Sequence, residues 1–110
     1  MILTPLLTSG ANPLSVTMNP TYPTYLASSS SGTTSTITAT VTGAVGAVTV
    51  LWTTGGYLVP VSPTNLTTDF SFIGLFSAFE SIYDSVTVTV TDSFGRQADF
   101  TTDFHVFRIS

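Results

Sequence analysis

The chain has 110 residues, which is enough for one domain but not for two. Charged residues make up 7% of it, whereas its 22 threonines and 14 serines amount to about a third, so hydroxyl groups take the place of charges on the surface. The net charge is -4, and the chain has two arginines and no lysine. So few positive charges exclude a basic nucleic-acid-binding patch and a polybasic membrane anchor.

The chain has no cysteine, which excludes disulfides and thiolate metal sites. No apolar stretch is long enough to form a membrane-spanning helix. The N-terminal residues Met1–Leu7 are apolar, but they are short, lack a basic stretch and are interrupted by Pro5, so they make a poor secretion signal. We therefore expect a protein that is made in a cytoplasm and is not exported by the usual route.

An apolar arm, residues 1–13, precedes the domain that we expect to span residues 14–110. The large apolar residues of the arm have no periodicity that would place them on one face of a sheet. Exposed apolar patches usually mark interaction sites, so these residues are candidate interface residues. They are Ile2, Leu3, Leu6 and Leu7.

Apolar and polar residues alternate along most of the domain, which predicts strands. The regular segments are residues 14–18, 36–42, 47–53, 86–91 and 98–106, with shorter or less regular strands at 57–61 and 66–72. Pro20 and Pro23 restrict Tyr22–Leu26 to an extended edge position. About seven short strands predict an antiparallel β-sandwich. A jelly roll is an alternative, because strand count does not determine topology.

The segments between the strands have distinct compositions. Ser28–Ser35 is a polar loop, and Gly43–Gly46 and Asp92–Gly95 are turns. Ile73–Ile82 carries apolar residues at roughly helical spacing, which predicts a single helical turn or a crossing loop. Near residue 106 the apolar residues change parity, which predicts either a bulge or a strand end buried on both faces.

Two segments carry a resemblance to a known fold family. Trp52 lies in a valine-rich strand, and the run Ser85–Arg96 (SVTVTVTDSFGR) is similar to the F strand and F–G turn of immunoglobulin-like domains of the PKD and bacterial Ig-like kinds. Such domains occur in bacterial surface proteins and in structural proteins of tailed phages. The resemblance covers about residues 14–109 and implies an immunoglobulin-like sandwich with Trp52 in its core on strand C. The sequence departs from the family pattern in lacking the disulfide pair, and Tyr83, near the place of a tyrosine corner, has the opposite parity to the valines that follow.

No residue pattern indicates catalysis. His105 is the single histidine, and we expect it on the outward face of the last strand, solvated or at an edge. Asp99 and Asp103 share that face about 13 Å apart, which is wide for the carboxylate pair of a glycosidase. Turns near Asp69 or Asp92 could bind calcium, although no segment has the dense oxygen ligands of an EF-hand loop. We expect a non-enzymatic protein without a cofactor.

Three tyrosines, Tyr22, Tyr25 and Tyr57, lie near predicted edges or loops, beside proline or glycine. Tyrosine is favoured at interfaces because its ring is apolar and its hydroxyl is polar. These residues are candidates for packing at a subunit interface, and sugar stacking is the other interpretation.

These observations lead us to expect a structural interaction module. The expected protein is a virion protein of a tailed phage, either a capsid decoration (cement) subunit or a tail accessory subunit, assembled in the host cytoplasm. Its partners would be copies of itself or major capsid or tail proteins, bound through the arm and the edge strands. The loops Ser28–Ser35 and Gly43–Gly46 would face solvent or the host. The alternatives are a carbohydrate-binding or adhesion module on a phage or bacterial surface, and a repeat from a large adhesin.

Overall fold

A computed structural model describes residues 13–73 and 77–109, and this part of the chain is all-β, with ten strands and no helix. The strands are β1 (Ser15–Asn19), β2 (Thr24–Ala27), β3 (Gly32–Thr33), β4 (Ile37–Thr42), β5 (Thr49–Thr54), β6 (Val59–Pro60), β7 (Thr67–Thr68), β8 (Phe70–Phe72), β9 (Ser81–Thr91) and β10 (Gln97–Arg108). The all-β prediction is confirmed. The expected number of about seven strands is too low, because β3 lies in the segment predicted as a polar loop and the single strand expected over residues 66–72 is divided into β7 and β8.

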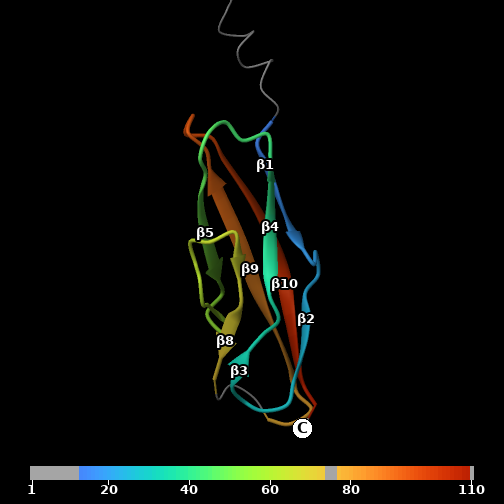
Figure 1. Ribbon diagram of the computed structural model, residues 1–110. Helices are drawn as coiled ribbons and strands as arrows, with labels where there is room; N and C mark the ends of the chain where they lie inside the picture. Colours follow the sequence, from blue (N-terminus) through green and yellow to red (C-terminus); the bar gives the residue numbers. More distant parts are fainter. Residues whose placement is uncertain (1–12, 74–76, 110) are drawn as a thin grey trace, which may run out of the picture.

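The strands form three sheets, with the orders β1-β4-β7, β2-β10-β9-β5 and β3-β8-β6 (Figure 1). The long antiparallel pair of β9 and β10 keeps one continuous register from Gln97 opposite Thr91 to Phe107 opposite Ser81. A bulge near residue 106 is therefore a wrong prediction. The alternative agrees better with the structure, since Val106 is buried on one face of β10 and Phe107 is half-buried on the other.

One strand pair is parallel, which corrects the expectation of a fully antiparallel sandwich. β2 runs parallel to β10, with Tyr25 opposite Val106, while the other pairs in the described residues are antiparallel. The reason is that the chain leaves the edge of one sheet after β1 and joins the edge of another as β2. Prolines in the connection suit this change, because they have no N–H to donate to a ladder. The predicted edge position of this segment is confirmed for Thr24–Ala27.

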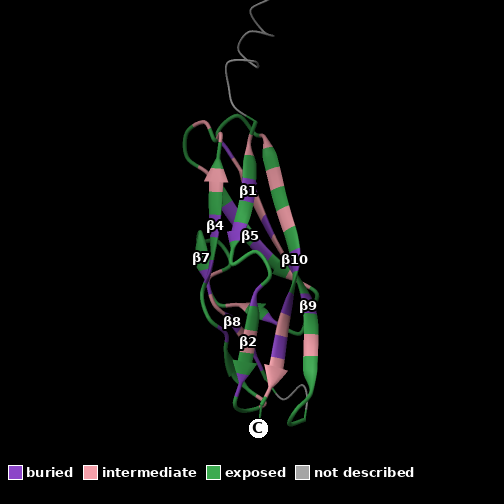
Figure 2. Ribbon diagram, turned by 90° about the vertical axis from the view of Figure 1, so that its right-hand side faces the viewer, coloured by how far each residue is buried: buried purple, intermediate pink, exposed green. Residues whose placement is uncertain are grey.

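Side chains from all three sheets meet in one core, which gives a sandwich-like arrangement. The ring of Phe70 on β8 packs edge to face against those of Trp52 on β5 and Phe104 on β10, and the ring centroids are 5.8 Å apart in each contact. Trp52 is buried, as predicted, and its indole N–H donates a hydrogen bond to the carbonyl of Asn65 at 2.7 Å. Along the strands, buried residues alternate with exposed ones, as the bands in Figure 2 show.

The segment Ile73–Ile82 is not helical in the part that the structure describes. Ser81 and Ile82 already belong to β9, and residues 74–76 lie outside the described residues. Phe79 has a positive φ of 65° and donates its backbone N–H to the carbonyl of Arg108 at 2.7 Å. The described residues 77–80 agree with the predicted alternative of a loop, and the end of this segment is fixed by pairing with the end of β10.

Replacement of Phe104 tests the central position of the aromatic contacts. Phe104→Ala should lower the free energy of unfolding by about 3–5 kcal/mol, because it removes a fully buried ring and leaves a cavity. The matched control is Phe94→Ala, which removes an exposed ring and should change stability by less than about 0.5 kcal/mol. Urea denaturation followed by tryptophan fluorescence measures both. Equal effects would contradict the assignment of the core.

Candidate functional site

Two loops meet at one end of the molecule (Figure 1). Residues 43–48 connect β4 to β5, and residues 92–96 connect β9 to β10. The described chain begins at the same end, because Ser15 pairs with Thr42, the last residue before the first loop. Any segment that precedes residue 13 is therefore joined to the domain beside these loops.

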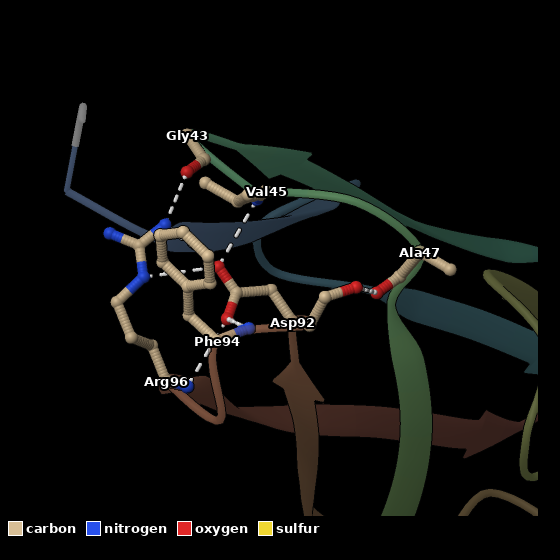
Figure 3. A network of polar contacts seen from close by, with 7 residues as sticks. Gly43, Val45, Ala47, Asp92, Phe94 and Arg96 are labelled. Carbon is tan, nitrogen blue, oxygen red and sulfur yellow. Dashed lines mark hydrogen bonds and ion pairs between the residues drawn. The ribbon is translucent and has the colours of Figure 1, made fainter.

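A buried carboxylate, that of Asp92, ties the two loops together (Figure 3). It accepts hydrogen bonds from the backbone N–H groups of Val45 at 3.1 Å, Phe94 at 3.0 Å and Arg96 at 3.1 Å. The Arg96 guanidinium adds two charge-assisted bonds, from Nε at 3.0 Å and from Nη2 at 2.7 Å. Nη2 also donates to the carbonyl of Gly43 at 2.8 Å, so the Arg96 side chain links the two loops.

The hydrogen bonds to Asp92 also determine its charge state. Burial raises the pKa of Asp92, but hydrogen bonds from the Arg96 side chain and from three backbone N–H groups outweigh it and hold the pKa below the ordinary 3.8. Both oxygens of this carboxylate accept hydrogen bonds from donors within the protein. The other turn residue, Asp69, accepts a hydrogen bond from Thr36 Oγ1 at 2.6 Å. Among the described residues no cluster of three or more His, Cys, Asp or Glu could hold a metal ion.

Ser93 provides a second link between the loops. Its backbone N–H donates to the carbonyl of Val45 at 3.0 Å, and its hydroxyl donates to the carbonyl of Ala47 at 3.3 Å. Gly46 allows this close approach, since a Cβ there would lie 2.3 Å from Ser93 Oγ and its φ is +73°.

The linked loops present an aromatic side chain to solvent. Phe94 is 66% exposed, and the guanidinium carbon of Arg96 lies 6.0 Å from the centroid of its ring. We call residues 92–96 the β9–β10 tip. Because its backbone is held by the network around Asp92, binding through Phe94 would require little further ordering of the loop.

The three predicted tyrosines do not form one surface. Tyr22 is 82% exposed between β1 and β2, while Tyr25 is half-buried, with its ring 6.1 Å from that of Phe72. Tyr57 is exposed in the loop after β5. Since β2 and β5 are the opposite edges of one sheet, Tyr57 is separated from the other two.

The candidate interface residues of the arm lie outside the described residues, so the structure does not place them. They are Ile2, Leu3, Leu6 and Leu7. The loops Ser28–Ser35 and Gly43–Gly46 lie at opposite ends of the molecule, since Ala27 bonds to Ile109 at the end of the described chain. The two loops therefore do not form one continuous surface.

From the sequence, the β9–β10 tip was identified as a turn, but not as a candidate binding site. The available signal was an aspartate at the start of the turn with an arginine four residues later, a spacing that lets Arg96 bind Asp92. His105 lies on the outward face of β10, as expected, because Phe104 and Val106 are buried on the other face. The expected solvated or edge position is wrong, since β10 is an inner strand and the half-buried ring of His105 stacks on that of Tyr83.

Comparisons of the chain with family models, with curated proteins and with solved structures find no match. In the residues that the structure describes, no helix is long and apolar enough to cross a membrane. The function is therefore argued from the geometry.

The lowered pKa of Asp92 predicts a pH dependence of stability. The ionised carboxylate is favoured by folding, so its contribution is present above the ordinary pKa of 3.8 and is lost as the pH falls through the lower folded value. Asp92→Asn should destabilise the protein at neutral pH and weaken the loss of stability in acid. Urea denaturation as a function of pH measures this, with the exposed Asp99→Asn as control. If the free energy of unfolding fell with pH in the same way for the wild type and Asp92→Asn, the account would be contradicted.

Two glycine substitutions distinguish the loss of stability caused by backbone strain from the loss caused by disturbing the contact between the loops. Gly46→Ala and Gly95→Ala both place an alanine at positive φ, which costs about 1–2 kcal/mol. Gly46→Ala also forces Ser93 aside, whereas nothing lies within 4 Å of a Cβ at Gly95. Gly46→Ala should therefore be more destabilising by about 1 kcal/mol or more, as measured by thermal unfolding. Equal losses would show that the two loops are not in close contact.

Proposed function

We propose that the protein is a non-enzymatic virion structural protein of a tailed phage, a capsid decoration (cement) or tail accessory subunit with an immunoglobulin-like sandwich. One observation carries the proposal. The exposed Phe94, on a tip braced by Asp92 and Arg96, lies at the same end as residue 13, where the apolar arm joins the domain. A neighbouring subunit docked at this end would contact both the tip and the arm.

The strand order supports an immunoglobulin-like assignment. In such a sandwich, strands A, B and E lie in one sheet and strands C, F and G in the other. The order β1-β4-β7 corresponds to A, B and E, and β5-β9-β10 corresponds to C, F and G. Trp52 on β5 then occupies the place of the buried tryptophan on strand C.

The composition supports attachment through apolar contacts. An exposed aromatic ring on a preorganised loop is typical of the residues that dominate binding energy in interfaces. The few charges of the chain leave little electrostatic repulsion between subunits packed side by side. The arm would bury its leucines and isoleucine against the neighbour, and the outer edge of β2 would provide a further contact.

A carbohydrate-binding or adhesion module is the second candidate. The highly exposed Tyr22 beside the outer edge of β2 supports it, because an aromatic ring of this kind can stack on a sugar. Binding to a glycan array that is lost in Tyr22→Ala would favour this candidate over the first.

Two variants of the full chain test the first candidate. One replaces Ile2, Leu3, Leu6 and Leu7 by serine, and the other is Phe94→Ala. Each should weaken co-sedimentation with particles of the phage that encodes the chain by about tenfold or more, since removal of a hot-spot residue costs about 2 kcal/mol or more. Tyr57→Ala, at a distant exposed position, is the control and should bind as wild type does. Unchanged binding by both variants would contradict attachment through this end.

A further inference from the structure

A second surface, distinct from the β9–β10 tip, lies on the outer face of the four-stranded sheet. Tyr83 on β9 and His105 on β10 are direct cross-strand neighbours, and their rings stack with centroids 4.3 Å apart and planes 6° apart. The His105 ring also lies 6.4 Å from that of Phe107. Tyr83 is nevertheless 62% exposed, so one face of the stacked pair is open to a ligand. Eight residues of β9, about 27 Å, separate Tyr83 from Thr91 beside the tip.

The histidine in this stack is held without full hydrogen bonding. Its Nε2 atom is buried and has no hydrogen-bond partner among the described residues. Buried polar atoms are normally paired, and exceptions call for an explanation. The imidazole is held by stacking face to face against the tyrosine ring.

The charged residues on the outer face of β10 beside the stack are negative. Arg108, three residues beyond His105 on β10, has the parity of the inner face. Asp103 precedes His105 by two residues on the same face of β10, lies opposite Ser85 and is exposed. Asp99 lies on the same face, four residues further along, and is also exposed. The chain has no lysine, and Arg96 is bound to Asp92 at the other end of β9.

We propose that this face binds a partner protein through an arginine or lysine side chain of the partner, whose cation lies over the open ring of Tyr83 and pairs with Asp103. A cation within about 6 Å of an aromatic centroid is attracted by the ring, and a neighbouring carboxylate strengthens the attraction. Charge complementarity argues against a second copy of this chain as the occupant. Two such faces would bring Asp99 and Asp103 against acidic residues of the same kind. The proposal adds a second contact to a subunit attached by its tip and arm.

Binding can be followed at a single reporter group. Because His105 is the one histidine of the chain, its imidazole C–H signals in a proton NMR spectrum are unambiguous. The probe is the peptide acetyl-Gly-Arg-Gly-amide, and the control is the same peptide with citrulline, which has the shape of arginine without its charge. We expect a saturable shift of the His105 signals with the arginine peptide, at millimolar concentration, and none with the citrulline peptide.

Variants distinguish the roles of the two residues. Asp103→Asn should weaken the binding of the arginine peptide about two- to fivefold, whereas Asp99→Asn, on the same face, should leave it unchanged. Tyr83→Ala should abolish the response, and Tyr83→Phe, which keeps the ring, should preserve it. Since Asp103 is exposed, its variant should fold, and the test does not depend on Tyr83→Ala.

Several results would overturn the proposal. An equal response to the citrulline peptide would show that charge is not recognised. Equal weakening of peptide binding by Asp99→Asn and Asp103→Asn would show that the peptide responds to the overall negative charge of the face and does not bind at a defined site. A shift on dilution without peptide would identify a second copy as the occupant, and a shift with maltose but not with the peptide would identify a sugar platform.

Discussion

The edge-to-face contact of Trp52, Phe70 and Phe104 is the interaction on which the rest of the structure depends. These rings come from β5, β8 and β10, which are far apart in the sequence and belong to two sheets, and no disulfide supports them. Their burial, together with that of the valines of β9, supplies the hydrophobic driving force that a weakly charged chain needs to fold. The hydrogen bond from Trp52 to the carbonyl of Asn65 lets the largest side chain enter the core without leaving its N–H unpaired.

Two buried carboxylates flank the buried valines of β9. On the inner face of β9, three buried valines are preceded by Asp84 and followed by Asp92. Asp84 accepts the backbone N–H of Leu58 at 2.8 Å, and a Cβ on Gly55 would collide with it. Asp92 organises the tip in the same way. Each aspartate therefore lies at one end of the valine row and binds the backbone of a neighbouring loop, so the exposed ring of Phe94 is placed by the strand that also carries part of the core.

Much of the fold could be predicted because the alternation of apolar and polar residues along a strand indicates which of its faces is buried. Val86, Val88 and Val90 show this, since their parity gives both the strand and its inner face. The two-residue strand β3, in the segment predicted as a polar loop, and the parallel pairing of β2 with β10 depend on partners distant in sequence, so no local pattern encodes them. The candidate tip was missed for a similar reason: the sequence shows Asp92 in a turn, but its bond to Val45 across 47 residues appears only in the folded chain.

The central claim is that the end carrying the β9–β10 tip is the end by which the protein attaches to its neighbours. Hydrogen–deuterium exchange of the full chain, free and bound to phage particles, tests it most directly, because it reports which backbone amides lose access to solvent. The account predicts new protection in residues 43–46 and 92–96 and in the arm, residues 1–13. Protection confined to residues 28–35 at the opposite end, with the tip unchanged, would contradict it.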